Sequence, residues 1–268
     1  MAGQNCRMRS FVGLRGAPLQ RKIFSITLVP RHATYMASER FAAFVEQFLS
    51  SLSIDAELPS EIDILQPYYD PEVRRVVHEM CRTFYAGAHA RIGVWGINPG
   101  RFGAGITGLS FTDPWAVEND LGIETTLTGR RELSAEFISR VISAYGGPKA
   151  FYHDVYMSAL SPLGFIRNGV NINFYDDAEL ASRLRPQIIQ WMNLALDAGV
   201  RRDVTIILGT GKLRQYSERY IRSEVGLDRV IYLDHPRYIM QYRRRDVAVY
   251  VQKYVEAIRS CLDSSNRS

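Results

Sequence analysis

One side-chain amide and a group of glycines are the residues in this chain best suited to chemistry. An apolar run over residues 91–97 ends at Asn98, and the next ten residues contain Pro99 and four glycines, Gly100, Gly103, Gly105 and Gly108. Glycines let the backbone approach a flat ligand or a phosphate closely, because they have no Cβ. The fixed φ of Pro99 would hold the Asn98 amide at the tip of a strand. An Asn-Pro-Gly tripeptide is also typical of an ordinary turn, so a ligand site needs a second signal.

That second signal is a histidine near the carboxyl end of the chain. Another apolar run covers residues 229–233, and His235-Pro236 follows it, 137 residues after Asn98. An imidazole can donate or accept a hydrogen bond near neutral pH, which suits it to proton transfer or to stabilising a developing charge. A single histidine at a strand end is more often structural, so its position relative to Asn98 decides the interpretation.

The surrounding sequence predicts the elements that would position these two residues. Apolar runs predict four strands, at residues 91–97, 150–159, 204–208 and 230–233. Amphipathic stretches predict helices that begin at Met36 and Asp113 or span 70–86, 134–145, 177–198, 210–225 and 243–261. Pro186 should kink the 177–198 helix or divide it. The alternation predicts an α/β fold, a three-layer α/β/α sandwich around a central, mostly parallel four-stranded sheet, which would bind ligands at the carboxyl ends of its strands.

The two motifs resemble those of a known family. Gly96-Ile97-Asn98-Pro99-Gly100 resembles the first motif of the uracil-DNA glycosylase superfamily, and Phe102-Gly103, Thr107-Gly108 and Phe111 follow at the spacing of its single-strand-selective (SMUG) branch. His235-Pro236 resembles the second motif of the superfamily, in the right order. Residues 235–242 most resemble a second, bacterial subfamily of that branch. The resemblance covers roughly residues 92–254 and implies a uracil-DNA glycosylase-like fold.

The resemblance also implies an activity and a role for each residue. It implies a monofunctional glycosylase that hydrolyses the N-glycosidic bond of uracil or a C5-modified uracil in DNA, in base excision repair, and leaves an abasic site. Asn98 would position the water, His235 would stabilise charge on the departing base, and Phe111 would stack on the flipped base. Without the family, Phe111 would fit the core equally well. The other expected base-binding residues are Ile97, Gly100, Phe102, Ser158 and Asn173.

The chain departs from the family after the second predicted strand. The branch places an asparagine there to read the edge of uracil, whereas this chain has Ala159 or, with a shift of one residue, Ser158. An alanine cannot supply the paired donor and acceptor of an amide. Recognition would then fall to Ser158, to Asn171 or Asn173, or to the backbone. We expect activity on uracil with altered tolerance at C5, so that hydroxymethyluracil competes.

The segment after His235 is predicted to probe the duplex. Residues 237–245 are expected to form a loop whose Tyr238, Ile239, Met240 and Gln241 wedge into the base stack. Arg237 and the run of Arg243, Arg244 and Arg245 would hold phosphates, although a charge run is usually a solvated helix face. The turn Gly209-Thr210-Gly211-Lys212 lacks the spacing of a phosphate-binding P-loop, so Lys212 is expected near the DNA backbone instead.

Charge is concentrated at the amino terminus. Residues 1–35 contain six of the 33 basic residues and no acidic residue, which leaves 27 basic against 28 acidic residues in 36–268. DNA binding must therefore rest on local patches. We expect residues 1–35 to be a disordered basic tail, or translation to start at Met36; a targeting peptide is the competing interpretation. Residues 36–268 are expected to form a single glycosylase-like catalytic domain.

Composition limits the cofactors, partners and location that we expect. The longest apolar run falls short of the roughly 20 residues of a membrane helix, so no membrane association is expected. The three cysteines and five histidines are too scattered for a disulfide framework or a metal site, so no metal and no cofactor are expected. The expected partner is DNA, with a flipped-out base, bound by a monomer in a bacterial-type cytoplasm. The alternative function is a non-catalytic binder of damaged DNA bases.

Overall fold

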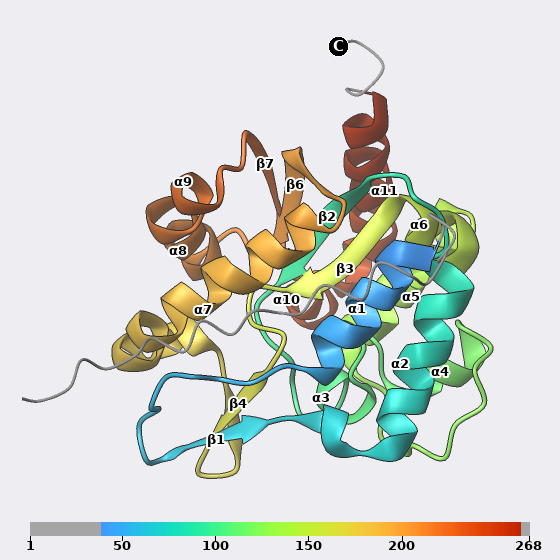
Figure 1. The fold of residues 1–268 in the computed structure, drawn as a ribbon. Helices are drawn as coiled ribbons and strands as arrows, with labels where there is room; N and C mark the ends of the chain where they lie inside the picture. Colours follow the sequence, from blue (N-terminus) through green and yellow to red (C-terminus); the bar gives the residue numbers. More distant parts are fainter. Residues whose placement is uncertain (1–38, 264–268) are drawn as a thin grey trace, which may run out of the picture. The chain divides into compact units, whose positions relative to one another are not determined.

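The computed structural model describes residues 39–263, whose centre is a four-stranded sheet (Figure 1). All strands run parallel, in the order β3-β2-β6-β7. Their bounds are β2 (Arg91–Gly96), β3 (Val155–Ala159), β6 (Val200–Leu208) and β7 (Arg229–Leu233). Both β2 and β3 are buried along their whole length, as expected when helices cover both faces. The predicted mostly parallel four-stranded sheet is confirmed.

Helices cover both faces of this sheet, which confirms the predicted three-layer architecture. In Figure 1, α1 and α7 lie in front of the sheet, whereas α5, α10 and α11 lie behind it. The main helices are α1 (Arg40–Ser50), α2 (Pro71–Phe84), α5 (Leu133–Tyr145), α7 (Ala178–Asp197), α8 (Lys212–Tyr220), α10 (Pro236–Tyr242) and α11 (Val247–Asp263). Shorter ones are α3 (Ala104–Thr107), α4 (Pro114–Asn119), α6 (Pro148–Asp154), α9 (Arg222–Val225) and the 3-10 turns η2 (Pro67–Tyr69), η3 (Phe174–Asp176) and η4 (Arg244–Asp246).

A second, smaller sheet was absent from the sequence prediction. It is antiparallel, in the order β1-β4-β5, and is formed by β1 (Ile62–Leu65), β4 (Gly164–Arg167) and β5 (Val170–Ile172). This sheet packs directly against the segment after β2, because a Cβ on Gly164 would lie only 2.4 Å from the carbonyl oxygen of Pro99. The small sheet therefore supports the loop that contains Asn98.

Four predicted elements differ in the structure. The single helix predicted over residues 210–225 is divided into α8 and α9. Residues 148–154, expected to be mainly strand, form α6, which Pro148 opens at a first-turn position where its missing N–H does no harm. The segment after His235, expected to be a loop, forms α10. Pro186 neither divides nor ends α7, which continues from Ala178 to Asp197. The predicted tail, residues 1–35, lies outside the described residues.

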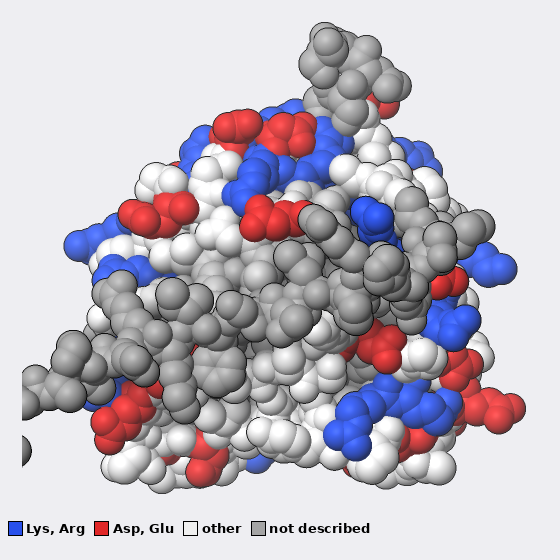
Figure 2. All heavy atoms as spheres, in the orientation of Figure 1, with Lys and Arg blue, Asp and Glu red and all other residues white. Residues whose placement is uncertain are grey.

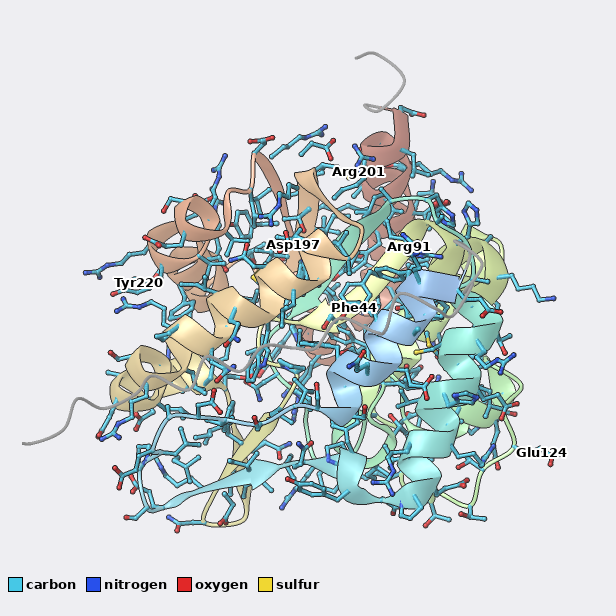
Figure 3. The ribbon with its side chains drawn as sticks, in the orientation of Figure 1. Phe44, Arg91, Glu124, Asp197, Arg201 and Tyr220 are labelled. Carbon is cyan, nitrogen blue, oxygen red and sulfur yellow. The ribbon has the colours of Figure 1, made fainter. Side chains whose placement is uncertain are left out.

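A buried arginine ties α1 to the amino end of β2. Arg91 is fully buried, and its guanidinium carbon lies 4.5 Å from the centroid of the Phe41 ring of α1 (Figure 3 labels Arg91). The guanidinium also donates to the carbonyl oxygens of Tyr152 at 3.1 Å and of Ala86 at 2.8 Å. These carbonyl acceptors replace water, which allows the charge to be buried.

Among the helices of residues 39–263, none has both the length and the apolar character needed to span a membrane.

Candidate active site

A pocket of about 110 Å³ opens where β2, β3 and β7 end. Ile97 and Asn98 line it just beyond β2, Ala159 lines it at the last position of β3, and His235 lines it just beyond β7. Because the strands are parallel, their carboxyl ends meet at one edge, and residues 137 positions apart in the sequence share one cavity. The two residues expected to do the chemistry, Asn98 and His235, are therefore brought together.

The side chain of Asn98 is fixed by backbone atoms. Its Nδ2 donates to the carbonyl oxygen of Ile172 at 3.2 Å and to that of Pro99 at 3.3 Å. Its Oδ1 accepts from the backbone N–H of Phe174 at 3.1 Å. Both protons of the amide are thus engaged, whereas Oδ1 keeps a lone pair for one more donor, such as a water molecule.

The imidazole of His235 is held in one tautomer. His235 is the N-cap of α10, and its Nδ1 accepts from the backbone N–H of Arg237 at 3.2 Å. Since a backbone N–H can only donate, Nδ1 is unprotonated, and the neutral ring carries its proton on Nε2. Burial, together with the charge of Arg237, lowers the pKa of His235 to about 4. The ring is therefore a neutral hydrogen-bond donor near pH 7.

Phe111 forms an aromatic wall of the pocket. Its ring centroid lies 5.9 Å from that of His235, with the planes inclined by 49°. The backbone of Phe111 has φ of +56°, which few residues other than glycine adopt. A Cβ on Gly96 would lie 2.5 Å from Cζ of Phe111, so the glycine at the end of β2 makes room for the ring. The ring both packs against the core and lines the pocket.

The end of β3 settles which of two small residues faces the pocket. Ala159 lines it, whereas Ser158 is buried and does not, because successive side chains of a strand point to opposite faces. Ser158 therefore does not line this pocket, and its role in binding the base stays a prediction. Two amides from the segment after β4 line the pocket instead. Asn171 accepts from the backbone N–H of Arg101 at 3.3 Å, and Asn173 donates to Asp176 at 2.8 Å.

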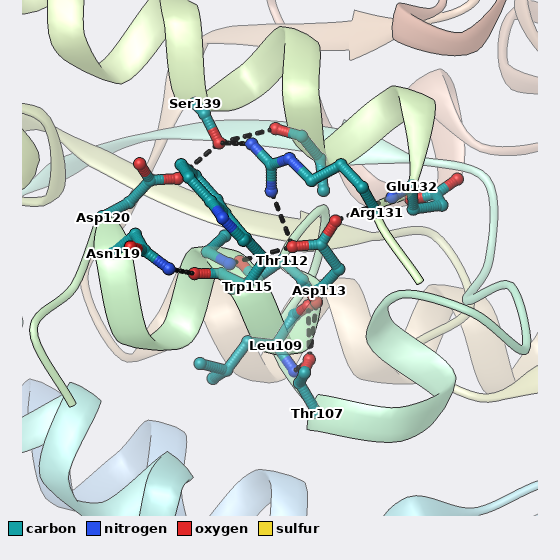
Figure 4. Close-up of polar contacts among 12 residues, drawn as sticks. Thr107, Leu109, Thr112, Asp113, Trp115, Asn119, Asp120, Arg131, Glu132 and Ser139 are labelled. Carbon is teal, nitrogen blue, oxygen red and sulfur yellow. Dashed lines mark hydrogen bonds and ion pairs between the residues drawn. The ribbon is translucent and has the colours of Figure 1, made fainter. Parts of the chain in front are cut away.

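A buried carboxylate that the sequence analysis missed anchors one wall of the pocket. Asp113 is fully buried and accepts from the backbone N–H of Ala116 at 2.9 Å and of Glu132 at 2.7 Å (Figure 4). It also forms an ion pair of 2.6 Å with Arg131. This network holds Glu132, whose side chain lines the pocket and whose pKa burial raises. Only the N-cap pattern Asp113-Pro114 was visible in the sequence.

Comparison with known proteins identifies the family. A sequence profile of the uracil DNA glycosylase superfamily matches residues 83–259. This chain belongs to the uracil DNA glycosylase superfamily. Among solved structures, the crystal structure of wild-type Pedobacter heparinus SMUG2 is similar to it, with a TM-score of 0.80 and 34% sequence identity over 83% of this chain and 98% of that one. Comparison with curated proteins gives no match.

In this superfamily member, α10 buries two of the residues that were predicted to wedge into the base stack. Ile239 and Met240 are buried, at 0% and 2% exposure, because the helix turns them into the core. In this conformation Ile239 and Met240 are not available to enter a base stack, and their role as a wedge stays a prediction. Tyr238 is 40% exposed, and Tyr242, which the sequence analysis did not single out, is 64% exposed. Their ring centroids lie 5.5 Å apart on one face of the helix.

The remaining predicted DNA-contact residues lie around the pocket at different distances from it. Arg237 is exposed and lines the pocket itself. Gln241 and Arg243 are exposed on α10 and after it, and a hydrogen bond with Tyr238 raises the pKa of Arg243. Lys212 begins α8 outside the pocket lining and pairs with Asp176 at 3.0 Å.

Of the predicted base-binding residues Gly100 and Phe102, only Gly100 lines the pocket. Gly100 lines the pocket, as expected for a base-binding residue. Phe102 does not; it lines a neighbouring cleft, where two arginines stack on its ring. Phe102 is therefore not in position to contact a base in the pocket.

Within residues 39–263, no group of three or more His, Cys, Asp or Glu residues lies close enough to hold a metal ion.

Proposed function

We propose that this chain is a monofunctional DNA glycosylase that hydrolyses the N-glycosidic bond of uracil, or of a C5-modified uracil, and leaves an abasic site. The observation that carries the proposal is the pairing of Asn98 and His235 in one small pocket. The Asn98 amide keeps one free lone pair, and the His235 ring is fixed as a neutral Nε2–H donor. Membership of the uracil DNA glycosylase superfamily supports the same reaction.

The pocket suits a reaction in which the base departs before water attacks. As the bond between N1 of the base and C1′ of the sugar breaks, negative charge collects on N1 and O2. The Nε2–H of His235 donates to that charge, and a preorganised donor of this kind contributes roughly 3–4 kcal/mol. Water held at Oδ1 of Asn98 then forms the new bond to C1′ and loses its proton to solvent, since an amide cannot accept one.

Selection of the base is proposed to rest on Asn171 and Asn173. Ala159 supplies no polar side-chain atom at the position where the SMUG branch reads uracil. The Oδ1 of Asn171 is engaged with the Arg101 backbone, which leaves its Nδ2 protons for a base carbonyl. Asn173 directs Nδ2 to Asp176 and keeps Oδ1 as an acceptor. We expect looser discrimination at C5 than an amide on β3 would give.

DNA outside the pocket is proposed to contact α10. The exposed pair Tyr238 and Tyr242 could stack on bases or occupy the gap that the flipped nucleotide leaves. Arg237, Gln241 and Arg243 would hold the adjacent backbone, and Lys212 would contact a more distant phosphate. The tyrosines thus take the place of the wedge that the sequence assigned to Ile239 and Met240.

The first experiment measures excision from uracil-containing single- and double-stranded oligonucleotides, with hot alkali to reveal abasic sites. We expect cleavage by the parent and losses of about 10²–10³-fold in kcat for Asn98→Ala and for His235→Ala. Ser158→Ala serves as a matched control, because Ser158 faces away from the pocket. Activity that persists in both pocket variants would contradict the assigned roles.

The alternative is a binding protein for damaged bases that has lost turnover. The alanine at position 159 favours it, because the base-reading amide of the SMUG branch is missing there. The retained Asn98 and His235 argue against it, since binding alone requires neither residue. Tight binding of uracil-containing DNA by folded protein, with no abasic product, would establish this alternative.

A further inference from the structure

A second cavity opens beside the pocket and shares part of its wall. This cleft has a volume of about 480 Å³. Four residues line both cavities: Gly100, Glu132, Asn171 and Arg237. Any group that emerges from the pocket along this wall therefore enters the cleft. The roles proposed above involve Asn171 and Arg237 of the shared wall, but none of them uses the side chains of Arg101, Phe102 or Arg130 of the cleft.

The cleft is lined by arginines, two of which stack on one aromatic ring. The guanidinium carbons of Arg130 and Arg101 lie 3.6 Å and 4.7 Å from the centroid of Phe102. Arg101 also donates to the carbonyl oxygen of Gly169. Stacking on a ring restricts a guanidinium while leaving its N–H edge available for an oxyanion.

The charges of these two arginines are not neutralised by the protein. Within residues 39–263, neither Arg101 nor Arg130 forms an ion pair with a carboxylate, and both are exposed. Arg131, by contrast, is paired with Asp113. Glu132 is the acidic residue of the cleft lining, and it faces the charge of Arg237. The cleft therefore has unpaired positive charge at Arg101 and Arg130.

The wall that holds Arg130 is built on a rigid support. The next two residues, Arg131 and Glu132, are both bound by the buried carboxylate of Asp113, at 2.6 Å and 2.7 Å. On the opposite side, the backbone N–H of Arg101 donates to Asn171 of β5 at 3.3 Å. The two arginines are thus presented from anchored backbone, which reduces the entropy lost when they bind a ligand.

We infer that this cleft binds a phosphodiester group of the DNA strand next to the extruded nucleotide, through Arg101 and Arg130. The inference rests on the proposed function, because a nucleotide whose base fills the pocket must carry its own phosphates past the shared wall. Guanidinium groups match the geometry of phosphate oxygens and can bind them with two hydrogen bonds. Phe102, which was expected to contact the base, instead serves to orient the two arginines.

The test replaces one phosphate charge at a time. Oligonucleotides carry a single neutral methylphosphonate directly 5′ or 3′ of a 2′-fluoro-deoxyuridine, whose N-glycosidic bond resists hydrolysis. Affinity is measured over a salt series for the parent, Arg101→Ala and Arg130→Ala, with Arg82→Ala as a matched exposed arginine on α2, outside both cavities. Circular dichroism and thermal unfolding confirm that each variant is folded.

We expect each cleft variant to bind the all-phosphate strand about three- to tenfold more weakly than Arg82→Ala does. On a single strand, the salt slope should fall by about 0.7 for each phosphate that the variant no longer neutralises. One of the two methylphosphonate substitutions should weaken DNA binding by the parent. The same substitution should not weaken binding by the variant that lacks the arginine contacting that phosphate. Equal salt slopes for all three variants would overturn the inference. So would losses of binding free energy that are simply additive for every combination of an arginine variant and a methylphosphonate.

Excision of ordinary deoxyuridine by the same proteins distinguishes a failure of the proposed function from a failure of the cleft assignment. The cleft variants should retain the single-turnover rate at saturating enzyme and lose activity only through KM. A parent that binds with the expected coupling but excises nothing would contradict the proposed function alone. A parent that excises uracil without any coupling to Arg101 or Arg130 would contradict the cleft assignment alone.

Discussion

His235 is kept neutral by its surroundings, and this fits the role of a hydrogen-bond donor. Protonation would require Nδ1 to release the backbone N–H of Arg237 and would place a second positive charge beside that side chain. Both effects oppose the imidazolium form. A donor that is already neutral can stabilise charge on the leaving base over the whole physiological pH range, without first losing a proton.

This arrangement predicts the pH dependence of excision. With a pKa of about 4 rather than 6.5, His235 stays neutral as the pH falls from about 8 to about 5. The rate should be level over that range and fall as His235 gains a proton near pH 4. Stability should also fall from about pH 6.5 towards pH 4, because the unfolded chain takes up that proton first. The measurement is single-turnover excision from pH 4 to 8.

A histidine with an ordinary pKa would instead give a fall in rate centred near pH 6.5, which would contradict the prediction. His235→Asn is the control, since its amide donates a hydrogen bond but does not titrate in this range. Glu132 also lines the pocket and has a raised pKa. An inflexion that persists in His235→Asn belongs to Glu132.

Ala159 offers a second test at the scale of one residue. Because it lines the pocket at the end of β3, Ala159→Asn places an amide where the SMUG branch has one. We expect the ratio of kcat/KM for uracil over hydroxymethyluracil to rise by about tenfold, the effect of roughly one hydrogen bond. Ala159→Leu has a similar size without the amide. An equal rise in the leucine variant would mean that bulk, not hydrogen bonding, sets the selectivity.

The site residues that could be predicted are those that directly follow a recognisable sequence pattern. Asn98 and His235 each follow an apolar strand directly, so sequence spacing alone places them at one sheet edge. Asp113 and Glu132 come together across eighteen intervening residues, which include α4, and no periodicity connects them. Sequence alone left Ala159 and Ser158 as alternatives, and the structure places Ala159 in the pocket lining because adjacent side chains of a strand point to opposite faces.

At the scale of elements, the loop between α4 and α5 depends on one carboxylate. Asp113 caps α4 through the N–H of Ala116 and also binds Arg131 and the backbone of Glu132. Asp113→Ala should destabilise the fold by about 3 kcal/mol, because three hydrogen-bond donors, one of them the ion-paired Arg131, lose their buried acceptor. Urea unfolding measures this loss, and KM for DNA should rise as the wall of the pocket loosens.

Asp70→Ala provides the matched control for this prediction. Asp70 caps α2 by accepting from the N–H of Glu72 at 2.8 Å, but it is exposed and is not ion-paired to an arginine in the described part of the chain. Its loss should reduce stability by about 1 kcal/mol, the usual value for an N-cap, and should leave KM unchanged. Equal effects of the two substitutions would mean that Asp113 acts only as a helix cap.

Elements defined by short or ambiguous patterns were the ones that sequence reasoning missed. The apolar run of residues 150–159 fits a strand or a buried helix equally well, and the structure divides it between α6 and β3. The strands of the small sheet have only three or four residues, and β1 pairs with β4 across about a hundred positions, as in Ile62 with Arg167, whereas β4 and β5 form a local hairpin. In contrast, the four strands of the main sheet were all found, because each contains an apolar run, although the mostly polar first part of β6, residues 200–203, was not predicted.

At the scale of the whole molecule, charge is distributed unevenly between the body and the amino-terminal segment. On the face drawn in Figure 2, the visible basic and acidic side chains are interspersed. Residues 36–268 contain 27 basic and 28 acidic residues, whereas residues 1–35 contain six basic residues and no acidic one. Specific contacts in the body would then come from local sites such as the arginine cleft, and the segment 1–35 would add attraction that is independent of sequence.

Removal of residues 1–35 separates these two contributions. Asn98 and His235 of the pocket and Arg101 and Arg130 of the cleft all lie within residues 39–263, so the shortened chain should keep the single-turnover rate at saturating enzyme. Its affinity for DNA should fall at low salt, and the salt slope should decrease by up to about 4 on a single strand if all six basic residues contact phosphates. At about 0.3 M salt the two chains should bind alike, since screening removes the contribution of the tail. A lower saturating rate would show that residues 1–35 take part in the active site itself, and an unchanged salt slope would show that they do not contact DNA.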